Sequence, residues 1–368
     1  MQNPSKADTT VHATVNPIAA LAWAPSLFDS GRLAFTSGKN LFIGKIGETP
    51  DILHTFGANV QALTWNSASD TLYTGSDSGV DVLDVPTGKL KHQIHSAENG
   101  DSRIVSCKWS GDHNILVTAH ANAGGSAVEF SDGRVDGLVF SIKLQTPPVD
   151  MDVRGSTIAC ALLPNVFCTF DMLMPKSEGY MTGFQRPPTA RNFNKIAFVS
   201  NDTLAIGATN GKIWISPSVR YMSSYGVGGR NRDGVEPFLF TPSPHEKPGQ
   251  ADASTSTSTS NANVQSSISS LASTGGNVTM ASGNTDGRFY FWDVASRGAI
   301  YRSGDGTRGN HLPVCFKADG ATAVPAPCEI SACGFSITKT HFAYAASSCD
   351  GSALFMHTIR DDVKLTLV

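Results

Sequence analysis

Short apolar segments separated by polar turns recur along the whole chain. Typical pairs are VQALTW (60–65) with DTLYTGSDSG (70–79), and NKIAFVSN (194–201) with DTLAIGATNG (202–211). Within the segments apolar and polar residues alternate, and β-branched and aromatic residues are frequent, which is typical of strands with one buried face. Gly at the segment ends supplies turn positions with positive φ. A helical interpretation fails, because the segments are short and Gly interrupts them every few residues.

The strand pattern repeats with a nearly constant period. Trp23, Trp65 and Trp109 each end the first strand of a unit, at intervals of 42 and 44 residues. The clearest unit end is DGRFYFWD (286–293), and a weaker copy is DSGVDVLD (77–84). A turn, an apolar strand and a closing Asp in this order are typical of WD-repeat blades. Seven such units can be delimited. We therefore predict an all-β fold, a seven-bladed WD-repeat β-propeller.

The units are predicted to form one domain over residues 16–362. Residues 1–15 are predicted to be a disordered arm. In an alternative arrangement this arm adds a strand to the last blade and closes the ring. Long insertions are expected near 119–137, 218–264 and 302–328, and the second contains the Ser/Thr-rich tract ASTSTSTSNANVQ, which predicts disorder.

Composition narrows the class of protein. The chain has 368 residues, of which 40% are hydrophobic and 16% charged, with a net charge of −3. Such a chain can bury a large core but is no strong polyanion binder overall. No apolar run is long enough to cross a membrane, and the first residues do not resemble a secretory signal. The seven cysteines are odd in number and include no Cys-x-x-Cys pair. We therefore expect a reduced intracellular protein without a disulfide framework or zinc site.

The sequence offers no catalytic constellation. His residues are scattered, and no Ser-His-Asp arrangement, His cluster or paired carboxylate at motif spacing can be identified. We therefore predict that the protein is not an enzyme and carries neither metal nor cofactor. Trp292 and Phe291 are expected to belong to the core rather than to a ligand site.

Several longer stretches resemble one family of WD-repeat propellers. MASGNTDGRFYFWDVASRGAIYRS (280–303) and EISACGFSITKTHFAYAASSCDG (329–351) resemble the last two blades of the nuclear-pore mRNA-export propellers of the Gle/Rae type. The resemblance covers roughly residues 150–359, whereas the first three blades fit by pattern alone. The sister family is the spindle-checkpoint propeller of the Bub type. Aromatic residues in both quoted stretches favour the export family.

The resemblance implies binding of an acidic hairpin-like motif, called GLEBS, which lies across one face of the disc. Lys212 stands where the family has a turn arginine that pairs with acidic GLEBS side chains. A second family arginine aligns near Phe193, where Arg191 or Lys195 would substitute for it. Arg288 is a further candidate contact. The alternative is that Lys212 is a solvated turn residue and that Arg288 packs against the neighbouring blade.

The resemblance also suggests a cellular role. It implies a non-catalytic adaptor in mRNA export that binds an FG nucleoporin with a GLEBS motif at the nuclear pore complex of the nuclear envelope. Shuttling from the nucleus to the cytoplasm is left open. The alternative is a mitotic spindle-checkpoint adaptor that binds a GLEBS motif of a checkpoint kinase at kinetochores. A weak RNA contact through Arg230 and Arg232 is a further hypothesis, although the family's basic loop after Ser348 is absent here.

Overall fold

The structure, a computed structural model, consists of strands, turns and connecting loops wherever it describes the chain. The described residues are 9–26, 31–94, 103–121, 125–133, 137–173, 192–201, 203–216, 238–240, 267–274, 279–294, 298–302, 315–316, 323–324, 329–348 and 351–358. Over these ranges no helix long and apolar enough to cross a membrane is found.

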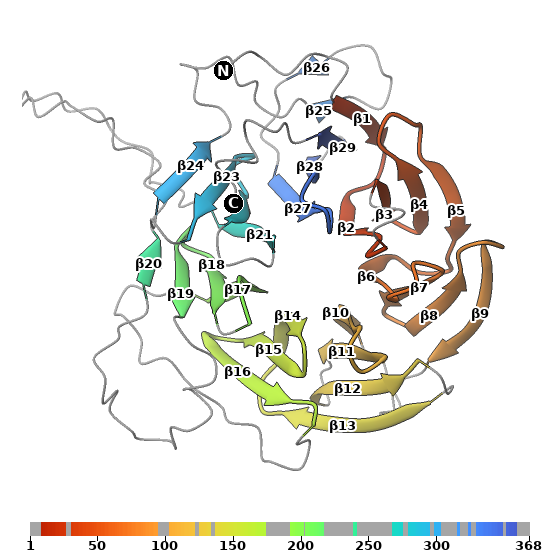
Figure 1. Cartoon of the computed structure of the whole chain (residues 1–368), viewed down its shortest axis with the longest axis vertical. Coiled ribbons are helices and arrows are strands. Elements are labelled where there is room, and N and C mark those ends of the chain that lie inside the picture. The colour runs from red at the N-terminus through yellow and green to blue at the C-terminus, as the bar shows by residue number, and fades with distance from the viewer. Residues whose placement is uncertain are drawn as a thin grey trace, which may run out of the picture.

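Seven antiparallel sheets surround a central opening like the blades of a propeller (Figure 1). Each blade is a meander whose first strand faces the centre. From the centre outward, the first three blades are β2 (Ile18–Trp23), β3 (Arg32–Ser37), β4 (Asn40–Lys45) and β5 (Asp51–Thr55); β6 (Val60–Trp65), β7 (Thr71–Ser76), β8 (Gly79–Asp84) and β9 (Lys89–Ile94); and β10 (Arg103–Ser110), β11 (Ile115–Ala121), β12 (Ser126–Asp132) and β13 (Leu138–Leu144).

The remaining blades follow the same plan. Blade 4 has three described strands. In order, blades 4 to 7 are β14 (Pro148–Arg154), β15 (Thr157–Leu162) and β16 (Val166–Asp171); β17 (Phe193–Phe198), β18 (Leu204–Ala208), β19 (Ile213–Ser216) and β20 (Phe238–Phe240); β21 (Ile268–Ser273), β22 (Thr279–Asn284), β23 (Phe289–Asp293) and β24 (Gly298–Arg302); and β27 (Glu329–Phe335), β28 (His341–Ser348) and β29 (Gly351–Thr358), completed by β1 (Thr9–Thr14).

The N-terminal segment closes the ring. β1 pairs antiparallel with β29, from Thr9 opposite His357 to Thr14 opposite Ser352, so it is the outer strand of blade 7. The prediction of a disordered arm is therefore wrong for residues 9–14, and the alternative of a ring-closing strand describes them. The physical reason is that β29 would otherwise expose an unpaired strand edge at the junction of the first and last blades.

A β-bulge interrupts every inner strand near its beginning. The shift in register falls between Ile18 and Ala20, Val60 and Ala62, Ile104 and Ser106, Pro148 and Asp150, Phe193 and Lys195, Ile268 and Ser270, and Ile330 and Ala332. The residue before the bulge is buried in all seven blades. The bulge is thus a structural equivalent in each repeat, and the residue before it is isoleucine in four of the seven blades, namely Ile18, Ile104, Ile268 and Ile330.

Side chains at the bulge tie successive blades together. The hydroxyl of Ser331 donates to the carbonyl of Ile18 at 2.7 Å, and the hydroxyl of Ser269 donates to the carbonyl of Ile330 at 2.7 Å. Near the other end of the same strands, the indole N–H of Trp23 donates to the carbonyl of Gly334 at 2.9 Å. Neighbouring inner strands therefore lie with their first residues side by side and their last residues side by side. The inner strands run in one direction, and we call the two faces of the disc the N face, where they begin, and the C face, where they end.

Small residues in the second strands make room for the next blade. A Cβ added to Gly75, Gly207 or Gly283 would lie 2.5, 2.6 or 2.4 Å from the Cγ2 atom of an isoleucine in the following blade. Each of these isoleucines stands just before a bulge and is fully buried; they are Ile104, Ile268 and Ile330. The core therefore lies between the blades, and its tightest contacts recur at one position of the repeat.

The three predicted insertions have different outcomes. Within the region 119–137, β11 ends at Ala121 and β12 occupies Ser126–Asp132, so most of the residues described there belong to strands and not to a loop. Of residues 218–264, the described part is β20, and the rest lies outside the described residues. Of 302–328, two short paired strands are described, β25 (Cys315–Phe316) and β26 (Ala323–Val324).

Candidate functional site: the central channel

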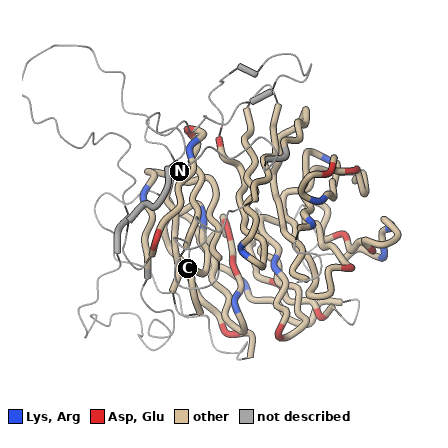
Figure 2. The backbone as a smooth tube through the Cα atoms, turned by 45° about the horizontal axis from the view of Figure 1, so that its top comes forward, with Lys and Arg blue, Asp and Glu red and all other residues tan. Residues whose placement is uncertain are grey.

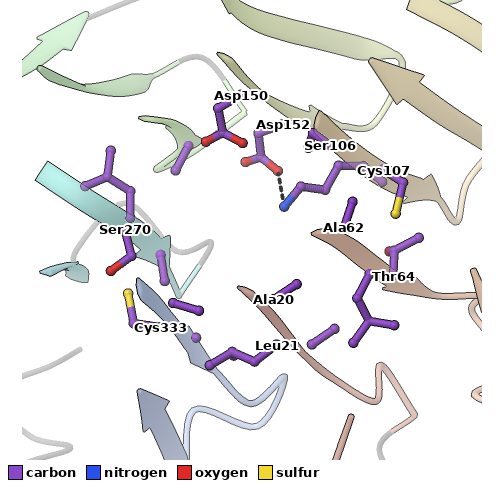
Figure 3. Close-up of a pocket in the computed structure, with 18 of the residues that line it drawn as sticks. Ala20, Leu21, Ala62, Thr64, Ser106, Cys107, Asp150, Asp152, Ser270 and Cys333 are labelled. Carbon is purple, nitrogen blue, oxygen red and sulfur yellow. Dashed lines mark ion pairs between the residues drawn. The ribbon is translucent and has the colours of Figure 1, made fainter. Parts of the chain in front are cut away.

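The seven inner strands enclose a central channel of about 490 Å³. Figure 3 shows its lining, with strands from different blades converging on one space. All of the charged lining residues come from blades 3, 4 and 5; they are Lys108, Asp150, Asp152, Arg154 and Lys195. Blades 6, 7, 1 and 2 contribute mostly small side chains to the same channel, among them Ala20, Ala62, Ser270 and Ala332. The channel is therefore charged on the side of blades 3 to 5, whereas the side formed by the other blades is lined mostly by small uncharged side chains.

Two carboxylates of blade 4 bind the open edge of blade 5. Oδ2 of Asp150 accepts the backbone N–H of Ile196 at 3.0 Å, and Oδ2 of Asp152 accepts that of Phe198 at 2.8 Å. An inner strand has no neighbour on the channel side, so its N–H groups there need other partners. The alternating Asp residues of β14 supply them. In this way two acidic side chains replace the strand that would continue the sheet.

Lys108 of blade 3 extends this contact to a third blade. Its Nζ lies 3.6 Å from Oδ1 of Asp152, the ion pair drawn as a dashed line in Figure 3. Burial acts to lower the pKa of Lys108, but the carboxylates of Asp152 and Asp150 outweigh burial, and the pKa is raised. The ammonium group therefore stays charged and helps to neutralise the acidic pair. Lys108, Asp152 and the N–H of Phe198 form a continuous polar link across blades 3, 4 and 5.

The opposite side of the channel carries a thiol. Cys333 and Ser270 lie there on β27 and β21 (Figure 3). Burial raises the pKa of Cys333 to about 11, against smaller opposing effects from the Ser270 hydroxyl and from Lys195. A thiol with such a pKa stays protonated near neutral pH and is a poor nucleophile. Within the described residues, no group of three or more His, Cys, Asp or Glu side chains could hold a metal ion.

Among the predicted site residues, Lys212 and Arg288 lie in turns on the N face, and Lys195 lies in the channel. Lys195 is the first residue after the bulge of β17 and lines the channel. Lys212 lies in the turn between β18 and β19, where Gly211 has a φ of 74° and the N–H of Lys212 bonds Oδ1 of Asn210 at 3.3 Å. The Lys212 side chain is half-buried. Arg191, Arg230 and Arg232 lie outside the described residues.

Arg288 occupies the equivalent turn of the next blade, between β22 and β23. Its N–H bonds Oδ1 of Asp286 at 3.2 Å, and its Nη1 lies 3.9 Å from Oδ2 of the same residue. The Arg288 side chain is 29% exposed. The guanidinium therefore forms only a long ion pair with the carboxylate of its own turn, and it retains N–H donors for a further acceptor. In the strand that follows, Trp292 is 4% exposed and donates its indole N–H to the hydroxyl of Ser282, so it belongs to the core as expected.

Sequence reasoning overlooked the acidic pair of β14. Asp150 and Asp152 alternate with apolar residues in the segment VDMDV, which occupies the inner strand of a blade. Charged residues at alternate positions of an inner strand were the available signal. Acidic and basic positions are otherwise interspersed along the described backbone (Figure 2).

Comparison with known proteins supports the fold. No protein-family model and no curated protein matches the chain. Among solved structures, the one described as U3-55K is similar with a TM-score of 0.67 at 11% identity, covering 96% of this chain and 99% of that one. The WD40 repeats of RRP9 give a TM-score of 0.67 at 12% identity, with 97% and 99% covered. Membership of the Gle/Rae family is not confirmed by these comparisons. The predicted fold is confirmed: this chain is an all-β, seven-bladed propeller of the WD40 type.

Proposed function

We propose that this protein is a non-catalytic docking platform that binds an acidic segment of a partner on its N face. The observation that carries the proposal is that Lys212 and Arg288 occupy equivalent turns on that face in the adjacent blades 5 and 6, with Lys195 of blade 5 lining the channel beside them in the sheet. WD40 propellers generally act as protein-interaction scaffolds, and the blades here are tied to one another by repeated hydrogen bonds. When the platform is rigid, the conformational entropy lost on binding is lost mainly by the flexible partner.

The partner that suits this site best is a GLEBS-type motif. Its acidic side chains would meet the ammonium of Lys212 in the β18–β19 turn, which keeps the positive charge of an arginine but lacks its bidentate fork. In this proposal the protein serves mRNA export as an adaptor for an FG nucleoporin at the nuclear pore complex, and it resides in the nucleus with passage to the cytoplasm. The support is the sequence resemblance of blades 4 to 7 together with the placement of the basic turns.

The second candidate partner is a checkpoint kinase with a GLEBS motif, bound at kinetochores. The same basic face would serve it, so the two roles differ in the partner and not in the site. A direct RNA contact through Arg230 and Arg232 stays a prediction, because the structure does not describe these residues. Against an enzymatic role, the described channel pairs its carboxylates with backbone N–H groups and a lysine, and its thiol stays protonated.

Calorimetric titration with two GLEBS peptides tests the proposal, one from the host's FG nucleoporin and one from its checkpoint kinase. We expect the nucleoporin peptide to bind and Lys212→Glu to weaken it by about tenfold or more, as for one contact in the centre of an interface. The matched control is Lys39→Glu, which places the same change in an exposed turn on the N face of blade 1. Tighter binding of the kinase peptide would select the checkpoint role. Binding of neither peptide would refute GLEBS recognition.

A further inference from the structure

Blade 4 carries two cysteines at directly opposed positions of neighbouring strands. Cys160 of β15 pairs with Cys168 of β16 in the antiparallel register. Directly opposed residues of antiparallel strands point to the same side of the sheet, and their Cα atoms lie about 4.5–5.5 Å apart. Both side chains are fully buried, and both thiols are free. The strand pairing therefore brings two reduced thiols together inside the core.

Equivalent positions in two other blades show that side chains placed in this way touch each other. The pair in blade 4 begins opposite Met151, the second residue after the bulge of the inner strand. In blade 1 the same position holds Phe35 and Phe42, whose rings stack with centroids 4.9 Å apart. In blade 7 it holds Tyr344 and Phe355, which stack at 4.8 Å. This position of the repeat therefore places two side chains in direct contact across the second and third strands.

The surroundings of the two thiols favour uncharged sulfur. A hydrogen bond with the Cys168 thiol, together with burial, raises the pKa of Cys160 well above its ordinary range, and Asp150 adds a smaller effect in the same direction. A soft metal ion held by both cysteines would require two thiolates in this apolar place. A disulfide carries no charge, so the same surroundings accept it. The chemistry that suits this pair is therefore a covalent link between the two sulfurs and not metal binding.

We propose that Cys160 and Cys168 form a redox-sensitive pair, which hydrogen peroxide converts into a reversible disulfide between β15 and β16. One sulfur, after transient loss of its proton, attacks the peroxide, breaks the O–O bond and becomes a sulfenic acid, while the other oxygen leaves as water. The second thiol then attacks the sulfenic sulfur, forms the S–S bond and releases another water. In total, two S–H bonds and one O–O bond break, each sulfur is oxidised by one electron, and the peroxide is reduced to two molecules of water.

The oxidant reaches the pair through local opening, because neither thiol is exposed in the folded protein. Among the described strands, β16 is the outermost of blade 4. Native proteins open locally at free energies below that of global unfolding, so oxidation should be slow but should not require the whole propeller to unfold. Once formed, the disulfide holds β16 against β15 and suppresses this opening. The pair is independent of the N-face proposal, since it lies in the core of a different blade.

Peptide mapping of the full-length folded protein tests the proposal. Cleavage after Arg154 and Lys176 releases residues 155–176, a peptide whose only cysteines are Cys160 and Cys168. The protein is treated with hydrogen peroxide, the excess is removed with catalase, and the chain is unfolded and alkylated before digestion. We expect this peptide to lose two hydrogens and to take up no alkyl group. Treatment with dithiothreitol before alkylation should restore both alkylation sites.

Cys107 is the matched control for the opposed pair. It is 1% exposed, but the residue opposite it is Thr118, so its thiol should remain open to alkylation after the same treatment. Cys168→Ser should preserve the alkylation site of Cys160, whereas Cys107→Ser should leave the disulfide unchanged. If Cys168→Ser does not fold, the wild-type peptide alone decides. Two alkyl groups on that peptide at every peroxide concentration would overturn the proposal, as would oxygen atoms on its cysteines in place of the link.

Urea unfolding of the oxidised protein gives a second measurement. A disulfide stabilises a protein mainly by restricting the unfolded chain. The midpoint of unfolding should therefore be higher in the oxidised protein and should return to the reduced value in dithiothreitol. An unchanged or lower midpoint would show that the link does not fit the folded register of β15 and β16, and it would also overturn the proposal.

Discussion

Trp65 donates its indole N–H to the backbone carbonyl of Ala22, which lies 43 residues earlier and in the preceding blade. Trp23 makes the corresponding bond to Gly334, and Trp109 makes one to Ser67. The regular spacing of these tryptophans along the sequence therefore has a specific structural cause. Each indole connects the end of its own inner strand to the preceding blade by a hydrogen bond. The tryptophan spacing in the sequence therefore matches the spacing of these contacts between blades.

Replacement of Trp65 by Phe should loosen one of these joints. Trp65 is 3% exposed, and the change leaves the carbonyl of Ala22 without this donor. We expect a loss of about 1–3 kcal/mol in the free energy of unfolding. Urea titration followed by circular dichroism measures it.

Trp109→Phe is the control for this joint. The acceptor of Trp109 is the hydroxyl of Ser67 in an exposed position, where water can take its place. Its replacement should therefore cost less than that of Trp65. Equal losses in the two variants would show that ring packing, and not the bond between blades, determines the effect.

The sequence predicted the propeller well, because its signals are local and periodic. Strand alternation, turn glycines and the Trp23–Trp65–Trp109 spacing each follow from a single blade. Joints between blades were harder to foresee, since the partner of Asp152 is a backbone N–H of Phe198 in the next repeat and carries no side-chain signal. The strand β12 was not foreseen, because the region 119–137 that contains it was interpreted as an insertion. The basic residues of the N face followed from resemblance and not from the repeat pattern.

Gly283→Ala should destabilise the contact between blades 6 and 7. The new Cβ would lie 2.4 Å from Cγ2 and 2.6 Å from Cβ of Ile330, so backbone or side chain must shift. We expect a cost of about 1–3 kcal/mol, as for overpacking in a core. Thermal unfolding compares it with Gly57→Ala, where nothing lies within 4 Å of the added Cβ. A neutral Gly283→Ala would mean that the blades can separate slightly without loss.

The link from Lys108 through Asp152 to Phe198 predicts an order among variants. Asp152→Ala leaves both the ammonium and a buried N–H without this partner, and should cost about 1–3 kcal/mol. Lys108→Met removes a partly exposed ion pair, and should cost about 0.5–1 kcal/mol near neutral pH. Urea unfolding of both variants measures the order. The reverse order would show that the ion pair outweighs the edge hydrogen bond.

The raised pKa of Lys108 also predicts a pH dependence. A group whose pKa is raised in the folded state stabilises it below its ordinary pKa, here 10.5, and this contribution is lost as pH rises through the folded value. The stability difference between wild type and Lys108→Met should therefore be constant from pH 7 to 10 and shrink above that. A difference that grows with alkaline pH would contradict the assignment.

His357 predicts a loss of stability in acid. Burial lowers its pKa from 6.5 to about 4, and its ring stacks on Tyr344 at 5.5 Å. The unfolded chain binds the proton more readily, so stability falls as pH decreases from about 6.5 towards 4. His357→Phe should remove on the order of 2 kcal/mol of this dependence. Unfolding midpoints at several pH values test it, and parallel curves for both proteins would exclude His357 as the cause.

The pairing of β1 with β29 sets the order in which the molecule can be completed during synthesis. β1 leaves the ribosome before every blade, yet its only described strand partner is the last strand of the last blade. Until β29 is made, six blades form an open arc whose two ends expose apolar faces, and β1 has no sheet to join. Closure is therefore a late, single event, and the nascent arc is the stage at which a chaperone or a partner protein has most surface to hold.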